Sequence, residues 1–297
     1  MFRRHSMVIA AAAVGCLALL PVTSAQAAAL AARATPRPGS TYSLAIRFQR
    51  LAGEPGRPRG PVASDPVAGC ERKLERARRQ RHDRQGVPAL AIAGASFTAG
   101  VGLGSPGKSW AAVLARRLHW DAVIYGDPGA GYVRAGIARQ GPVAAEIARL
   151  DLRALAPAVV IVQAGHDDIG VPPQLEQRRV EQAVTLIHAE APRARIALLT
   201  VFAGRSRSAA AYRTDHAIVT AGRAADRNVI IIDPLAARWA FPRSHDGLHP
   251  TAPGSAWIAG QVAGVLRQHG VRPAPPRPDT ANPIICDWSI AAPAPRR

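Results

Sequence analysis

The sequence predicts an α/β fold in which helices cover a parallel sheet of five strands. Its short apolar runs lack the polar alternation of half-exposed strands and are typical of strands buried on both faces of a parallel sheet. Amphipathic segments separate these runs, and this alternation is the pattern of βαβ units. With 297 residues, of which 48% are hydrophobic, the chain is long enough for one sizeable domain with tails.

The five strands are expected at residues 89–93, 122–125, 159–163, 196–201 and 229–233. Helices are expected where apolar residues recur three or four positions apart. They fall at about residues 110–118, 143–150, 180–187, 209–225 and 253–269. Right-handed crossovers then place helices on both faces of the sheet.

The amino terminus has the pattern of a secretory signal peptide. Arg3 and Arg4 precede an apolar run at residues 7–20, and Ala25-Gln26-Ala27 fits a small-residue cleavage site. The run is short for a membrane span, which needs roughly 20 apolar residues. We therefore expect residues 1–27 to be removed and the mature protein to be secreted or extracytoplasmic.

Composition divides the rest of the chain into three parts. Residues 28–87 are rich in Pro, Gly and Arg and predict an irregular N-terminal extension, with one short strand at 42–48 and a charged, solvated helix at 70–84. Residues 88–270 hold the α/β domain, and residues 271–297 form a Pro-rich C-terminal tail in which 284–288 is expected to dock on the domain.

The net charge of +18 at pH 7 comes almost entirely from arginines scattered along the chain. No recognition helix, zinc-finger spacing or aromatic RNA-binding motif accompanies them, which argues against a nucleic-acid partner. Association with an anionic cell envelope stays open. Removal of the signal peptide leaves Cys70 and Cys286, which form either a disulfide in an oxidising compartment or two unrelated thiols.

Ser96 is the candidate nucleophile. It follows the first apolar run and two small residues, Gly94 and Ala95, so it lies at the sheet edge where open α/β folds place their ligands. A serine needs a base to remove its proton, and the base works best when a carboxylate orients it. Asp246 and His249 provide such a pair in a loop after the fifth strand, with Asp246 near one ring nitrogen and the other free for serine.

Four blocks of this sequence resemble those of the SGNH hydrolases, the GDSL esterase/lipase superfamily. The blocks are residues 94–100 (GASFTAG), 126–131 (GDPGAG), 163–168 (QAGHDD) and 246–251 (DGLHPT). The resemblance covers about residues 88–270. It implies a flavodoxin-like three-layer α/β/α sandwich, a Ser96–His249–Asp246 triad and neither metal nor cofactor.

The resemblance also implies an oxyanion hole. Its donors are the backbone N–H groups of Ser96 and Gly129, with Gly131 as an alternative register, and the side chain at position 167. Here Ala95 replaces an acidic residue outside the triad, and Asp167 stands where the family has an asparagine. An ionised Asp167 would repel the developing oxyanion, so either Asp167 is protonated or the hole relies on the two N–H groups.

These features predict a secreted serine esterase acting on short-chain or acetyl esters of small molecules or glycans. Two alternatives remain at this stage. One is a binding protein of the cell envelope with the same fold and little or no activity, which the Asp167 substitution favours. The other is a metal-dependent hydrolase with N/O ligands drawn from six residues at one sheet edge. They are His166, Asp167, Asp168, His245, Asp246 and His249.

Overall fold

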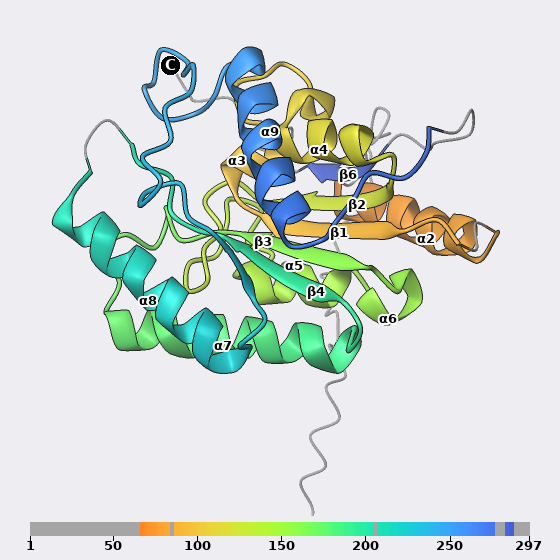
Figure 1. Ribbon diagram of the computed structural model, residues 1–297, viewed down its shortest axis with the longest axis horizontal. Coiled ribbons are helices and arrows are strands. Elements are labelled where there is room, and N and C mark those ends of the chain that lie inside the picture. The colour runs from red at the N-terminus through yellow and green to blue at the C-terminus, as the bar shows by residue number, and fades with distance from the viewer. Residues whose placement is uncertain (1–65, 84–85, 205–206, 277–282, 288–297) are drawn as a thin grey trace, which may run out of the picture. The chain divides into compact units, whose positions relative to one another are not determined.

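Six parallel strands form one sheet in the order β5-β4-β3-β1-β2-β6 (Figure 1). The structure is a computed structural model that describes residues 66–83, 86–204, 207–276 and 283–287. The strands are β1 (Ala89–Gly94), β2 (Asp121–Gly126), β3 (Val159–Gln163), β4 (Arg195–Leu199), β5 (Ile230–Ile232) and β6 (Ile284–Asp287). The predicted signal peptide and the strand expected at 42–48 lie outside the described residues.

Helices pack on both faces of this sheet, so the predicted three-layer α/β/α architecture is confirmed (Figure 1). On one face α4 (Trp110–Leu118) and α9 (Ala252–Gln268) pack together. On the other lie α2 (Pro66–Asp83), α5 (Val143–Arg149), α6 (Leu152–Leu155), α7 (Pro173–Glu190) and α8 (Ala209–Ala225). Two short helical segments, α3 (Ser96–Ala99) and η1 (Pro106–Lys108), lie between β1 and α4.

The central strand β1 shows why the strands are apolar throughout. Ala91 and Ala93 face the core beneath α5 and α7, whereas Leu90 and Ile92 face the core beneath α4 and α9. Every residue of β1 is buried. A strand covered by helices on both faces has no solvent-facing side, so its sequence does not alternate.

The sixth strand corrects the expected count of five. β6 comes from the Pro-rich tail and pairs with β2, with Cys286 opposite Tyr125. A disulfide joins Cys286 to Cys70 of α2, with their Cα atoms 5.1 Å apart. A four-residue apolar run among prolines is a weak local signal, and its strand conformation depends on pairing with β2, which is distant in sequence.

Helix α2 also differs from the solvated helix that its charge pattern predicted. Cys70 and Leu74 are buried in the hydrophobic core between α2 and the sheet. Charged residues such as Glu71 and Arg72 are exposed. None of the helices within the described ranges is both long and apolar enough to cross a membrane.

Candidate active site

Ser96 begins α3 directly after β1 and is 9% exposed. The chain turns tightly here because glycines end both β1 and β2. A Cβ on Gly94 would lie 2.6 Å from the carbonyl oxygen of Gln163, and one on Gly126 would lie 2.6 Å from the Ala99 nitrogen. Only glycine therefore lets α3 rest on the strand ends and present Ser96 at the carboxyl edge of the sheet.

Asp246 and His249 form a hydrogen-bonded pair in the loop that precedes α9. Oδ2 of Asp246 lies 2.7 Å from Nδ1 of His249, and its Oδ1 accepts the backbone N–H groups of Leu248 and His249 at 2.7 and 2.9 Å. Although desolvation raises the pKa of Asp246, these hydrogen bonds outweigh it and hold that pKa well below its usual value. Because the ionised carboxylate only accepts, Nδ1 carries the proton and Nε2 carries the lone pair.

The structure places His249 against the residue that follows Ser96. The ring of Phe97, the neighbour of Ser96, has its centroid 5.4 Å from that of His249. Nε2 of His249 is buried and has no hydrogen-bond partner among the described residues. A buried lone pair without a donor beside a serine can accept the proton of a nucleophile.

Gly129 and Gly131 differ in how their backbone N–H groups are used. The Gly131 N–H donates to the carbonyl of Arg134 at 2.9 Å. In the described part of the chain, the N–H groups of Gly129 and Ser96 have no protein acceptor. Gly129 also has φ +83°, a conformation natural to glycine. Of the two registers, the geometry favours Gly129 as the donor.

Asp168 and Asp127 hold the loop that carries Gly129. Asp168 accepts the backbone N–H groups of Tyr132 and Arg134 at 2.5 and 3.0 Å, and a Cβ on Gly131 would overlap its carboxylate. Asp127 accepts the N–H of Ala138 at 3.1 Å. Two buried carboxylates thus fix the backbone of this loop at residues 132, 134 and 138.

Asp167 lies near the same centre, since the charges of His166, Asp168, His249 and Arg134 all act on its carboxyl group. Burial raises its pKa, and the positive neighbours lower it in part. Among the described residues its side chain makes no hydrogen bond. His166 beside it donates from Nδ1 to the carbonyl of Phe202 at 2.9 Å.

Comparison with known protein families matches residues 92–257 to the GDSL-like Lipase/Acylhydrolase family. The chain belongs to this family. It is therefore an ester hydrolase of the GDSL type, as its sequence blocks predicted. A search of curated proteins found no match.

Solved structures support the fold of this GDSL enzyme. A carbohydrate esterase family 2 enzyme with a carbohydrate-binding domain from Corynascus thermopiles has a TM-score of 0.51 at 18% identity, covering 62% of this chain and 67% of that one. A salicylyl-acyltransferase, SsfX3, from a tetracycline biosynthetic pathway has a TM-score of 0.51 at 17% identity, covering 65% of this chain and 58% of that one. At such identities the likeness shows the fold.

Two polar residues that support the site of this GDSL enzyme were missed as functional candidates. Glu146 of α5 is fully buried and accepts the N–H of Gly94 at 3.0 Å. Gln163 ends β3 and accepts the hydroxyl of Thr98 at 2.9 Å. Glu146 had a signal in the sequence, because it lies three residues after Val143 and so on the apolar face of its helix.

The residues of the alternative metal site do not gather as ligands. Within the described ranges, no group of three or more His, Cys, Asp or Glu side chains is arranged to hold a metal ion. Asp168 is committed to backbone N–H groups and Asp246 to His249, while His245 is exposed.

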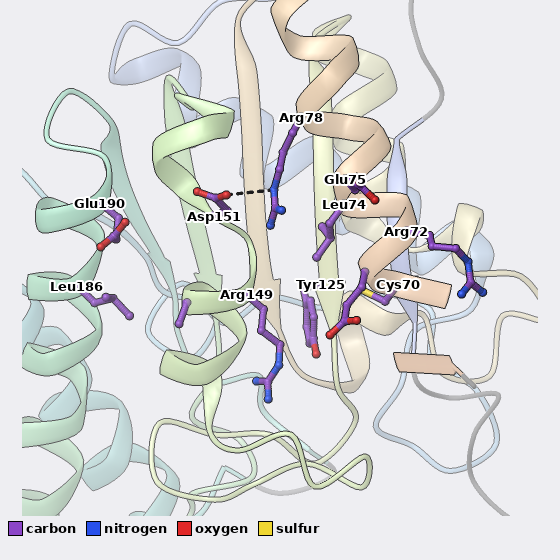
Figure 2. Close-up of a pocket in the computed structure, with 12 residues that line it drawn as sticks. Cys70, Arg72, Leu74, Glu75, Arg78, Tyr125, Arg149, Asp151, Leu186 and Glu190 are labelled. Carbon is purple, nitrogen blue, oxygen red and sulfur yellow. Dashed lines mark ion pairs between the residues drawn. The ribbon is translucent and has the colours of Figure 1, made fainter. Parts of the chain in front are cut away.

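A cavity of about 700 Å³ lies away from this centre, between α2, α5 and α7 (Figure 2). Its walls include the Arg78–Asp151 ion pair and Cys70 of the disulfide, and none of Ser96, Asp246 and His249 lines it.

Proposed function

We propose that this GDSL enzyme is secreted and hydrolyses short-chain or acetyl carboxylic esters through an acyl-enzyme on Ser96. The observation that carries the proposal is the buried Nε2 of His249, which has no hydrogen-bond partner among the described residues, while Asp246 holds the opposite ring nitrogen. In this arrangement the imidazole has one nitrogen fixed and one ready to take a proton.

The reaction follows from these positions. His249 Nε2 takes the proton of the Ser96 hydroxyl as its oxygen attacks the ester carbonyl, and the tetrahedral intermediate places negative charge on the former carbonyl oxygen. His249 then gives the proton to the departing alcohol, leaving an acyl group on Ser96. Water, deprotonated by the same Nε2, releases the acid and restores the serine.

The oxyanion is stabilised by the N–H groups of Ser96 and Gly129, which have no other acceptor in the described part of the chain. Asp167 is the third donor in its protonated form, which burial favours. Ionised, Asp167 would oppose the developing charge instead. The oxyanion hole of this enzyme therefore depends on the protonation of Asp167, whereas an oxyanion hole with an asparagine amide at this position does not.

An ester of an envelope glycan is the proposed natural substrate class. We expect short loops and no long lid between the four sequence blocks, which favours small acyl groups, and the charge of +18 favours association with anionic polymers outside the cell. Export rests on the signal-peptide pattern of residues 1–27. One solved neighbour is a carbohydrate esterase, which makes acetylated glycans a natural first test.

A panel of p-nitrophenyl esters with acyl chains of increasing length tests the proposal. The wild type should cleave acetyl and butyryl esters fastest, and Ser96→Ala should lower kcat to near background, about 10⁶-fold, because no acyl-enzyme forms. A serine-directed phosphonate should label the wild type at Ser96, and a chelator should leave the rate unchanged. Equal rates in wild type and Ser96→Ala would refute the acyl-enzyme, whereas loss of activity with the chelator would favour a metal-dependent hydrolase.

A further inference from the structure

A buried carboxyl group that the proposed reaction does not use lies behind the Gly129 loop. Glu176, in the first turn of α7, is 0% exposed. Its polar neighbour is Asp168, whose charge acts on it, and no N–H or O–H group of the described residues donates to either oxygen of Glu176. Asp168 in turn accepts the backbone N–H groups of Tyr132 and Arg134. Glu176 therefore lies next to the Gly129 loop, where its charge acts on Tyr132 and where Asp168 binds the backbone.

One proton must be shared between the two carboxyl groups. Burial raises the pKa of Glu176 to about 9, and the nearby Asp168 carboxylate raises it too. Burial also raises the pKa of Asp168, but the backbone N–H groups of Arg134, Val133 and Tyr132 counteract it. At neutral pH the proton consequently resides on Glu176, from which it can be donated to the Asp168 carboxylate, and the negative charge resides on Asp168.

We propose that Glu176 is a positioning residue for the oxyanion site. Glu176 holds Asp168, Asp168 holds the turn at residues 131–134, and this turn holds Gly129 two residues before it. The close fit of Gly131 to the Asp168 carboxylate, where a Cβ would overlap it, makes the position of the turn sensitive to any movement of Asp168. The inference rests on the proposed role of the Gly129 N–H.

Loss of the Glu176 proton should release the turn. Two negative charges would then face each other without solvent, and they separate only if Asp168 moves. Tyr132, the other titratable group at this position, is fully buried, and burial together with Glu176 and Asp168 raises its pKa well above the usual value. Arg134 acts on Asp168, and no charged group of the described parts of α5, α6 or α8 acts on Glu176.

The pH dependence of kcat tests the proposal with Glu176→Gln, which keeps a hydrogen-bond donor but cannot ionise. Wild-type kcat for p-nitrophenyl acetate should fall above about pH 9 by about tenfold per pH unit, with little change in KM. Glu176→Gln should hold its kcat through this range. Glu181→Gln, the same change at an exposed position of α7, should follow the wild type. An alkaline fall at the same pH in wild type and Glu176→Gln would overturn the positioning role.

Unfolding measured against pH tests the buried proton without reference to activity. A carboxyl group with a raised folded-state pKa binds more protons in the folded state, so stability falls as pH rises from its ordinary value toward about 9. The unfolding constant of the wild type, divided by that of Glu176→Gln, should rise by up to about tenfold per pH unit in this window. A flat ratio would overturn the proposal even if Ser96→Ala confirms the esterase.

The wild type alone provides a second test if Glu176→Gln does not fold. Its alkaline loss of kcat should reverse on return to pH 7.5, and its far-UV circular dichroism should stay constant throughout. Full activity at pH 10.5, or a loss that coincides with unfolding, would overturn the proposal. Either result would leave the acyl-enzyme chemistry to be judged by Ser96→Ala.

Discussion

The two sides of the active site use the same functional group in opposite ways. On the base side, the Asp246 side chain is 40% exposed, and hydrogen bonds keep its pKa well below the usual value. On the oxyanion side, Asp168 and Glu176 are fully buried, and burial raises the pKa of both. In the proposed mechanism, one carboxylate supplies charge to a catalytic group, and the buried pair supplies geometry to a backbone loop.

This difference explains how each side depends on its surroundings. Asp246 is held ionised by hydrogen bonds from residues of its own loop and by access to water, and the loop is closed by local hydrogen bonds such as Ser244 N–H to the His249 carbonyl at 2.8 Å. The buried pair is stable only with several donors and a retained proton. Substitution on the base side should therefore affect chemistry more than stability, and substitution on the oxyanion side should affect both.

Asp246→Asn should have the largest effect on rate. The amide no longer fixes the proton on Nδ1 of His249, and kcat should fall by about 10⁴-fold, the loss typical of a triad aspartate. Because the pair is partly exposed, the free energy of unfolding should change by less than about 1 kcal/mol. Kinetics with p-nitrophenyl acetate and urea unfolding measure the two quantities.

A second Asp–His pair provides the control for this substitution. His188 Nε2 lies 3.4 Å from Asp226 Oδ2, with neither residue at the site. Asp226→Asn makes the same chemical change there and should leave kcat intact. If Asp246→Asn retained near wild-type kcat, the imidazole would not depend on this carboxylate and the triad would be wrong.

Asp168→Asn should lower both rate and stability. An amide oxygen can accept fewer of the N–H groups of Tyr132 and Arg134, and each buried N–H left unpaired costs about 1–3 kcal/mol. Displacement of the turn should also remove the Gly129 donor and lower kcat by about 10²–10³-fold. Circular dichroism during urea unfolding and steady-state kinetics report these effects.

Comparing the change in kcat with the change in stability shows whether Asp168 positions an oxyanion donor. A destabilised variant with wild-type kcat would show that the turn at residues 131–134 does not position an oxyanion donor. Asp151→Asn is the matched control, because Asp151 is an exposed cap that bonds the Ala154 N–H at 3.3 Å, which an asparagine can also do, and because its ion pair with Arg78 is at the surface and contributes at most about 1 kcal/mol. It should change neither quantity appreciably.

The contact between Asp246 and His249 was predictable from sequence because its signal is local. Asp246 and His249 are three residues apart, so a single turn places one carboxylate oxygen on the imidazole. The five strands were predictable for a related reason, since burial on both faces leaves an apolar run within one segment. Block 94–100 begins at the end of β1, and block 246–251 directly precedes α9 in the connection that follows β5.

The oxyanion side was only half predictable because its contacts join distant segments. The glycine block did not decide between Gly129 and Gly131, and the deciding hydrogen bond from Gly131 to Arg134 exists only in the folded loop. Glu176 precedes Val180 by four residues and so lies on the buried face of α7, a signal for an unusual carboxyl group. The sequence does not reveal that its partner is Asp168, because an unrelated stretch of chain supplies it.

Asp167→Asn should have the smallest effect, and it should depend on pH. Below its raised pKa, Asp167 carries a proton and can donate to the oxyanion, so wild type and variant should have similar kcat values. Above that pKa the wild-type carboxylate repels the oxyanion, whereas the amide still donates. The ratio of the variant kcat to the wild-type kcat should therefore rise with pH and level off at no more than about 10²-fold.

Rates measured from pH 5 to 9 with Asp167→Asn and Asp167→Ala separate two causes of the higher kcat, the loss of the carboxylate charge and the presence of an amide donor. Alanine removes the charge without adding a donor, so it should recover only part of the increase. A ratio below one at neutral pH would mean that the carboxylate does not obstruct the reaction there. A ratio that is constant with pH would mean that Asp167 does not titrate during catalysis, and the oxyanion would then depend on the Ser96 and Gly129 N–H groups alone.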